Sequence, residues 1–349
     1  MRFFTNQHKF YCGIDLHANK MYVCVLDSSG ELKTHKNIDT NPQAFLGLIR
    51  EYREDIVVGV ECVFCWYWLA DLCRKENIEF VLGHALYMKA IHGGKAKSDK
   101  IDSRKLAGML RGGMFPLAYA YPSEMRATRD LLRRRLFFVR KRGELLAHVQ
   151  MTHHQYNLPA PGAKIKHHAN LEKFENPFLD ESTQRMFESD RYMIKHYTTE
   201  INKLEWYIRK KTKEDATNAL NIELLRTIPG VGVIIALTLL YEIHEIKRFA
   251  SVQNFSSYAR LVKPKKTSDG KKAGSGGGKI GNQHLKWIFG EATALFLRQS
   301  DEAKMHLKRL EKRYGSKARA MSVLSHKLGK AVYFMLHRQE AFNVNKVFQ

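Results

Sequence analysis

The sequence predicts an α/β domain at its N-terminal end, then a long helical segment, then a mostly helical C-terminal domain. Up to residue 122, short apolar runs alternate with amphipathic segments, a pattern typical of layered α/β domains. Over 123–215, apolar residues recur at heptad spacing, as in long paired helices. Helical patterns dominate the remainder, apart from one stretch rich in glycine, serine and lysine. We therefore place domains at 8–122, 123–215 and 216–340, followed by a tail at 341–349.

The first domain begins with three short strands connected by tight turns. The segments FYCGIDLH, MYVCVLD and ELKTHKNID supply them, at 10–17, 21–27 and 31–39. After these strands we expect helices at 42–54, at 66–77 and from residue 98 onward, and they alternate with strands at 55–63 and 78–84. Ser98 suits the N-cap of the last helix, because its hydroxyl can accept a backbone N–H. The order βββαβαβα indicates a sheet with helices packed on it.

The second segment predicts two long helices with heptad rows of apolar residues. The helix over 123–157 has a row made of Met125, Leu132, Val139 and Leu146. The helix over 182–214 has a row made of Phe187, Ile194, Ile201 and Ile208. Between them, the proline-containing insertion 157–181 is expected to be irregular. The two helices fit either a hairpin within one chain or a coiled coil between chains.

The third segment combines helices with one turn and one loop of interest. Residues 222–262 predict two helices joined by the turn Ile228-Pro229-Gly230-Val231-Gly232. The backbone N–H groups of Gly230 and Gly232 could grip a phosphate, or the turn could only connect two core helices. Residues 263–282 cannot hold a core, so we expect a functional loop there. Further helices are expected at 283–298, 301–313 and 316–338.

The charge balance argues against an ordinary small-metabolite enzyme. The chain has 58 lysines and arginines against 35 aspartates and glutamates, a net charge of +23. Such a surplus predicts a polyanionic partner, most simply nucleic acid. We find no apolar run long enough for a membrane span and no secretory signal, and we expect a cytoplasmic protein.

Four carboxylates occupy positions that general structural needs do not explain. Asp15 and Glu61 end apolar strands, where carboxylates are rare and costly to bury. Asp99 and Asp102 lie on one face of a helix start, although Asp99 alone could simply support the helix N-terminus. Converging carboxylates repel one another unless cations lie between them, and one or two Mg²⁺ ions would suit such a cleft. The pattern that places these acids is that of a ribonuclease H-like fold, and it predicts phosphodiester chemistry.

Two groups of basic residues are candidates for nucleic-acid binding. Asp130 is the single acid in the stretch that holds the first group, so these cations are hard to pair internally. The first group consists of Arg126, Arg129, Arg133, Arg134, Arg135, Arg140, Lys141 and Arg142. The second group consists of the loop residues Lys263, Lys265, Lys266, Lys271, Lys272 and Lys279. Phosphate contacts from either group would make binding depend on salt.

Taken together, these motifs resemble one known family. GID at 13–15, VGVE at 58–61 and SDKIDSRKLA at 98–107 resemble the acidic motifs of the DEDD transposases of insertion sequences. Three further segments resemble motifs of the family's C-terminal domain in their order and spacing. They are TIPGVGVIIALTLLYEI, RFASVQNFSSYARLVKP and SGGGKIGNQHLKWIFGEA, which begin at 227, 248 and 275. The family includes the Piv pilin-gene invertase and the bridge-RNA-guided recombinases.

The resemblance implies a RuvC-like N-terminal domain, a coiled-coil middle and a C-terminal transposase domain. It implies that the four acids form a Mg²⁺-binding tetrad and that Ser268 attacks DNA to form a phosphoserine bond. Ser275 competes for this role, but Ser268 matches the distances to both flanking motifs without a gap. It further implies a dimer of dimers that pairs donor and target DNA, with a structured bridge RNA choosing the sequences. Such a protein would be bacterial and associated with the nucleoid.

Other functions stay open on the sequence. A RuvC-like nuclease or Holliday-junction resolvase would use metal-activated water and form no covalent link to DNA. A site-specific DNA invertase would need no guide RNA. A basic nucleic-acid-binding protein with a degenerate nuclease domain is disfavoured, because all four acids are present.

Overall fold

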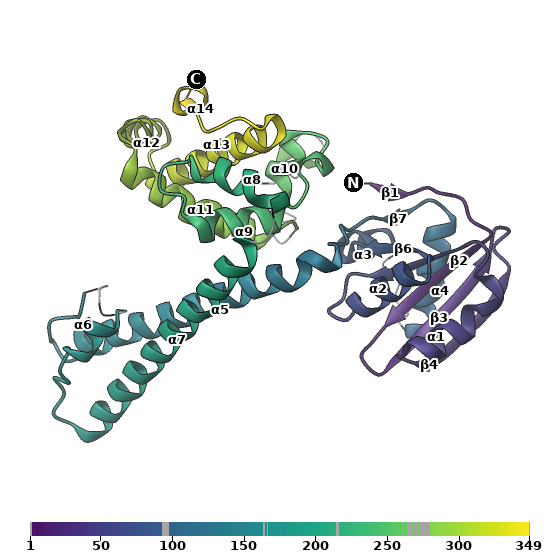
Figure 1. Ribbon diagram of the computed structural model, residues 1–349, viewed down its shortest axis with the longest axis horizontal. Helices are drawn as coiled ribbons and strands as arrows, with labels where there is room; N and C mark the ends of the chain where they lie inside the picture. Colours follow the sequence, from purple (N-terminus) through teal and green to yellow (C-terminus); the bar gives the residue numbers. More distant parts are fainter. Residues whose placement is uncertain are drawn as a thin grey trace. The chain divides into compact units, whose positions relative to one another are not determined.

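The structure is a computed structural model in which the chain forms two compact units, Met1–Glu124 and Met125–Gln349. It describes residues 2–92, 98–162, 165, 167–213, 216–263, 267–268, 271–272 and 280–348. Figure 1 shows both units with their helices and strands labelled.

A mixed sheet of five strands forms the centre of the first unit. Its strands are β2 (Phe10–Leu16), β3 (Lys20–Asp27), β4 (Leu32–Asp39), β5 (Ile56–Glu61) and β6 (Glu79–Gly83). Their order is β4-β3-β2-β5-β6, with antiparallel pairing from β4 to β2 and parallel pairing from β2 to β6. The five predicted strands are therefore confirmed. A separate pair, β1 (Phe3–Phe4) with β7 (Phe115–Pro116), was not predicted.

Helices cover both faces of this sheet. They are α1 (Pro42–Ile49, continued by a 3₁₀ turn at Arg50–Tyr52), α2 (Tyr67–Lys75), α3 (Ala85–His92) and α4 (Asp99–Arg111). Phe45 of α1 and Leu69 of α2 pack with Ile14 and Val60 on one face. Leu106 and Leu110 of α4 pack with Tyr11 and Val57 on the other. Neighbouring strand residues thus alternate between two buried faces, which explains the continuous apolar runs. Only α3 was missed.

The first half of the second unit is a hairpin of two long antiparallel helices, α5 (Ser123–Gln155) and α7 (Glu181–Lys213). Arg135 pairs with Glu205 near one end, and His148 pairs with Asp190 nearer the other, so the helices run in opposite directions. Figure 1 shows them side by side, with the short α6 (His168–Glu172) in the connection. The hairpin interpretation is confirmed within one chain.

The apolar rows of these helices are buried to different degrees. The predicted row of α7 is fully buried, from Phe187 to Ile208. In α5, Met125 and Leu132 are buried, but Val139 and Leu146 are only partly buried. Leu136 and Val149 supply the missing core positions. The strict heptad in α5 was therefore only partly right.

The rest of the second unit is a helical domain built around the apolar α9. Its helices are α8 (Ala216–Arg226), α9 (Val233–Ile243), a 3₁₀ turn (Ile246–Arg248), α10 (Val252–Tyr258), α11 (Gln283–Gln299), α12 (Asp301–Tyr314), α13 (Lys317–Arg338) and α14 (Val344–Phe348). Leu237 and Leu240 of α9 share one core with Phe289 of α11 and Leu328 of α13. None of the helices in the described ranges combines the length and apolar character that a membrane crossing needs.

The segment predicted as a tail is packed onto this domain. Its helix α14 ends with Phe348, whose ring centroid lies 4.5 Å from that of His306. Phe342 lies edge-on to Phe296 of α11, with ring centroids 5.5 Å apart. The last residues therefore form a wall of the C-terminal domain.

Candidate active site

The ends of the two central parallel strands define the first part of the candidate site. β2 and β5 pair with Gly13 opposite Gly59, and the same register brings Asp15 beside Glu61. A Cβ on Gly13 would lie 2.2 Å from the backbone nitrogen of Ala107, so this face of the sheet lies directly against α4. Because side chains alternate along a strand, Asp15 also points to the α4 side.

Asp15, His17 and Asp99 form the tightest polar group at this position. Their ligand atoms all lie within 4.8 Å of one another. His17 Nε2 lies 3.5 Å from Asp15 Oδ1 and 3.7 Å from Asp99 Oδ1. Adjacent ligands of an octahedral ion bound at about 2.1 Å lie about 3 Å apart, so a divalent cation fits this group after small shifts.

The start of α4 is fixed by two side chains. The Ser98 hydroxyl accepts a hydrogen bond from the Ile101 N–H at 3.3 Å, which confirms the predicted N-cap. His35 of β4 lies with its Nε2 2.9 Å from the Lys100 carbonyl oxygen and 3.1 Å from the Ser103 hydroxyl. These contacts hold the first turn, which carries Asp99 and Asp102, against β4.

Electrostatics in this group favour a bound cation. Burial raises the pKa of the Asp15 carboxyl, His17 opposes this rise, and the charges of Asp99 and Asp102 add to it. The charges of Asp99 and Asp102 therefore lie close enough to disfavour the ionised form of Asp15. A divalent cation would relieve that repulsion, so the charges of these residues fit a metal site.

Asp102 and Glu61 lie near this group but outside its closest set. Asp102 is half-buried and has Lys105 Nζ at 3.7 Å from its Oδ1. Glu61 is half-buried at the end of β5. The three-residue group thus contains two of the four predicted acids, together with a histidine that the sequence interpretation missed. The sequence did contain a signal for His17, because in extended backbone a residue two positions after Asp15 lies on the same face as Asp15.

Little of the predicted serine loop is described. Thr267–Ser268 form the short strand β8, which pairs with β9 (Lys271–Lys272), and Ser268 lies opposite Lys271. Ser275, Lys265, Lys266 and Lys279 lie outside the described residues, as do the side chains of Ser268 and Lys272. Lys263 and Lys271 are exposed.

The base of this loop is well defined. The Asn282 N–H donates to the Tyr258 carbonyl oxygen at 2.6 Å, and Arg260 Nε donates to the Ile280 carbonyl oxygen at 3.0 Å. Between them, Gly281 has φ +93°, and a Cβ there would lie 2.5 Å from the Tyr258 oxygen. Only glycine fits this approach, so the two ends of the loop leave the fold at one point.

Glu242 connects this point to α5. Its side chain is buried, yet it accepts hydrogen bonds from Arg129, Arg133 and Asn282. The Asn282 Oδ1 also accepts the N–H groups of His284 and Leu285, which caps α11. Burial raises the pKa of Glu242, but the Arg133 hydrogen bond and the two arginine charges outweigh it, so this pKa is lowered.

The arginine cluster was expected to be hard to pair internally, and this is wrong for three of its members. Arg129 and Arg133 pair with Glu242 of α9, and Arg135 pairs with Glu205 of α7. Arg126 is buried as well, and Arg142 donates to Thr198. Helical spacing could not reveal these partners, because they lie on other helices.

Other members of the cluster stay available to a ligand. Arg134 and Arg140 are exposed, and their guanidinium groups lie over the rings of Phe137 and Trp287. Lys141 pairs with Glu144 at 2.8 Å. Arginines that lie on aromatic rings can still contact phosphate.

The turn between α8 and α9 has a structural role at Gly230. Its φ is +85°, and a Cβ would lie 2.7 Å from the backbone of Leu295 in α11. Gly232, by contrast, has open space around its Cβ position and is the N-cap residue of α9. The turn therefore packs against the core at Gly230 and is accessible at Gly232.

An acidic group at the ends of central strands, on a chain of net charge +23, is typical of metal-dependent enzymes that act on nucleic acid. Comparison with known families agrees. Residues 12–157 match a family of DEDD transposases described as "Transposase", and residues 222–315 match one described as "Transposase IS116/IS110/IS902 family". No curated protein matches the chain.

The two matched segments together cover more than half of the chain and include both motif sets found in the sequence. The chain belongs to the DEDD transposases of the IS110 family. It is therefore a transposase, an enzyme that acts on DNA, from a family whose acidic motifs suggest the use of divalent metal.

Proposed function

We propose that the protein is an RNA-guided DNA recombinase of a bacterial insertion sequence, which cuts and rejoins DNA through a serine nucleophile and an acidic metal site. The observation that supports this most directly is the approach of Asp15, His17 and Asp99 within 4.8 Å at the end of β2. Family membership supports DNA as the substrate.

The first unit is proposed to be a RuvC-like, ribonuclease H-like domain. Support comes from its strand order, in which three antiparallel strands are followed by two parallel ones. The acids end β2 and β5 and begin α4, where they share one side of the sheet.

The donor set suits Mg²⁺ or a similar divalent cation. Asp15 and Asp99 would supply oxygen ligands, His17 a nitrogen ligand, and Asp102 and Glu61 further carboxylates nearby. When bound, such an ion lowers the pKa of a hydroxyl and neutralises charge on a phosphate. Without it, the same carboxylates would repel a DNA phosphate.

Ser268 is proposed as the nucleophile of the C-terminal unit. Its hydroxyl would give up its proton as Oγ bonds to the scissile phosphorus, the bond to the leaving DNA oxygen would break, and that oxygen would take up a proton, so none is gained or lost overall. Attack by another DNA hydroxyl would reverse these steps and release the serine, so the phosphodiester is conserved. Lys263 and Lys271, both exposed, would hold the DNA backbone near the loop.

The remaining parts of the proposal rest on the family resemblance. A structured RNA would choose the DNA sequences by base pairing, and its phosphates would contact exposed cations such as Arg134 and Arg140. A dimer of dimers would hold donor and target DNA, with acids and serine of one site supplied by different subunits.

Trapping of a covalent protein–DNA adduct tests the chemistry. A nicked suicide substrate, made from the DNA that flanks the coding sequence, is incubated with protein, co-purified RNA and Mg²⁺, then analysed on denaturing gels. We expect an adduct that Ser268→Ala and Asp15→Asn abolish and that Ser275→Ala retains. Asp39→Asn, the same change at an exposed position of β4, is the matched control.

The other outcomes are equally informative. Loss of the adduct in Ser275→Ala alone would show that the serine assignment is wrong. Cleavage that needs Asp15 but gives no adduct would identify a nuclease or resolvase that uses water. Full adduct formation after RNA removal would favour an invertase without a guide.

Metal binding by itself can be followed by electron paramagnetic resonance of Mn²⁺. We expect Asp15→Asn with Asp99→Asn to remove the bound signal, and His17→Ala to weaken binding without abolishing it. An unchanged affinity in the double variant would contradict the site.

A further inference from the structure

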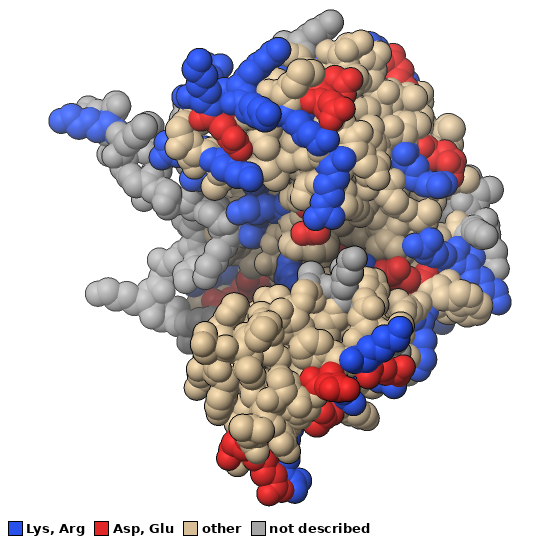
Figure 2. All heavy atoms as spheres, turned by 90° about the vertical axis from the view of Figure 1, so that its left-hand side faces the viewer, with Lys and Arg blue, Asp and Glu red and all other residues tan. Residues whose placement is uncertain are grey.

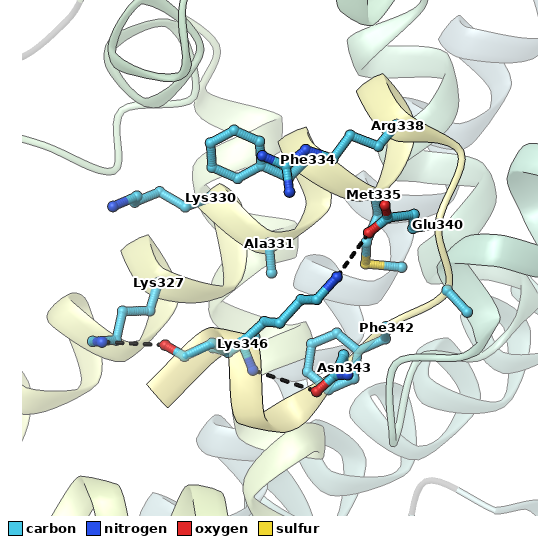
Figure 3. A pocket seen from close by; sticks show the side chains of 12 residues that line it. Lys327, Lys330, Ala331, Phe334, Met335, Arg338, Glu340, Phe342, Asn343 and Lys346 are labelled. Carbon is cyan, nitrogen blue, oxygen red and sulfur yellow. Dashed lines mark hydrogen bonds and ion pairs between the residues drawn. The ribbon is translucent and has the colours of Figure 1, made fainter. Parts of the chain in front are cut away.

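A cavity in the C-terminal unit is lined by residues that belong to neither the acidic group nor the serine loop. Its volume is 410 Å³, within the range of small-ligand sites, and it opens between α13 and the segment 340–347. Figure 3 shows side chains from both walls around it. The α13 wall presents Lys327, Lys330, Phe334 and Arg338, one stripe along the helix.

The charge of this lining is strongly positive. Four cations face one carboxylate, Glu340. Lys346 pairs with Glu340 at 3.0 Å, and Lys327 Nζ donates to the Val347 carbonyl oxygen at 3.2 Å. Within the described part of the chain, Lys330 and Arg338 form no ion pair with a carboxylate. An anionic ligand would find Lys330 without an ion-pair partner among the described residues, and Arg338 with only the more distant charge of Glu340.

The lining also offers a flat apolar surface. The Arg338 guanidinium lies 4.7 Å from the centroid of the half-buried Phe334 ring. Phe342 and Met335 add apolar area from the two walls. A planar guanidinium on an aromatic ring forms a platform on which a nucleobase can stack, and nearby lysines can hold its phosphate.

Basic residues surround this region more widely. Figure 2 shows one face of the molecule, where Lys and Arg side chains gather in the upper part, over the C-terminal helices. α12 alone has Lys304, Lys308, Arg309, Lys312 and Arg313. Such a field would raise the local concentration of a phosphate-bearing ligand.

We propose that this cavity binds one nucleotide, with its base stacked on Arg338 and Phe334 and its phosphate held by Lys330. The same chemistry belongs to a free nucleotide and to an unpaired nucleotide of a nucleic-acid strand. The proposal does not depend on the serine mechanism, because it concerns binding at a separate site.

The test compares two charge-reversal variants on the same helix. Lys330→Glu with Arg338→Glu alters the cavity, whereas Lys317→Glu with Arg319→Glu makes the same charge change at the exposed first turn of α13. Calorimetry with AMP, and anisotropy with labelled single-stranded oligonucleotides, measure binding, and thermal melts check folding. We expect the cavity variant to bind at least tenfold more weakly and the control to change less than twofold.

The arms of the experiment separate the two sources and the role of the base. Binding of AMP that the cavity variant loses assigns the site to free nucleotides. Loss confined to oligonucleotides assigns it to a strand. Phe334→Ala should reduce binding of an intact strand but not of an abasic one. Equal losses in both charge-reversal variants would overturn the proposal, as would equal binding of intact and abasic strands if AMP does not bind.

Discussion

Arg133 and Glu242 form a two-pronged ion pair inside the C-terminal unit, with Arg133 Nε 2.6 Å from Oε1 and Nη2 2.9 Å from Oε2. Arg129 and Asn282 complete the partners of the same carboxylate. Since Asn282 also closes the base of the serine loop, this pair connects the long helix α5 to the segment that holds Ser268. An arginine that looked like a nucleic-acid contact in the sequence therefore fixes internal structure.

Replacement of Glu242 by Gln should destabilise the second unit. It leaves the buried Arg129 and the half-buried Arg133 without their carboxylate, and breaking a buried ion pair typically costs about 3 to 5 kcal/mol. Urea unfolding monitored by circular dichroism measures the loss. Glu223→Gln breaks only an exposed pair with Arg226 and should cost less than about 1 kcal/mol. Equal costs for the two variants would contradict the structural role of Glu242.

Stability should fall in mild acid because of His284. Burial and then the Arg133 charge lower its folded pKa to about 4, whereas an unfolded histidine has the ordinary pKa of 6.5. Between these values only the unfolded state takes up the proton, so stability decreases as pH falls from 6.5 to 4, by at most about 1.4 kcal/mol per unit. Partial exposure of the ring reduces this figure.

His284→Gln isolates that effect from the other histidines. Urea midpoints at pH 7, 6 and 5 should fall less steeply in this variant than in the wild-type protein. Below about pH 4.5 both should lose stability further, because the lowered pKa of Glu242 makes its protonation unfavourable in the folded state. Parallel pH profiles of the two proteins above pH 5 would argue against the His284 assignment.

Gly13→Ala should displace α4 and weaken the acidic site. The added Cβ would meet backbone atoms of α4 at 2.2 and 2.4 Å, so the helix must move. We expect a cost of about 3 kcal/mol and a loss of Mn²⁺ affinity. Gly47→Ala is the control, because its Cβ meets nothing within 4 Å and alanine favours the helix. Retained Mn²⁺ affinity in Gly13→Ala would show that α4 need not lie so close.

The exposed arginines of α5 should govern salt-dependent binding, and the paired ones should not. Arg134→Ala with Arg140→Ala should lower the slope of log affinity against log salt concentration by about two, one for each lost phosphate contact. Arg133→Ala should instead lower the stability, with little change in slope. Filter binding of nucleic acid over a salt series, with melts alongside, distinguishes the two. A slope change confined to Arg133→Ala would reverse this assignment.

Local patterns in the sequence predicted much of the fold and two members of the closest polar group. The Ser98 cap and the apolar runs of β2 and β5 depend on neighbouring residues, so spacing reveals them. Asp15 was found because a carboxylate is unusual at the end of an apolar strand, and Asp99 because it shares one face of a helix start with Asp102. His17 was missed, because a single histidine after a strand has many ordinary explanations.

Contacts between distant residues could not be predicted in this way. Arg133 and Glu242 are 109 positions apart, and the residues around either one do not indicate that the other is its partner. The docking of Phe348 on His306 likewise depends on how α12 and α14 meet in space. Pairing of this kind becomes visible only when the helices are packed.

The closure between Tyr258 and Asn282 makes the serine loop an exchangeable cassette. Because both ends emerge at one hydrogen-bonded point with a glycine that admits no side chain, the helices on either side are held by that closure. Lengthening or grafting the segment between these anchors should leave the domain folded. The reach of the proposed nucleophile, Ser268, could thus be tuned, by evolution or by engineering, separately from the scaffold.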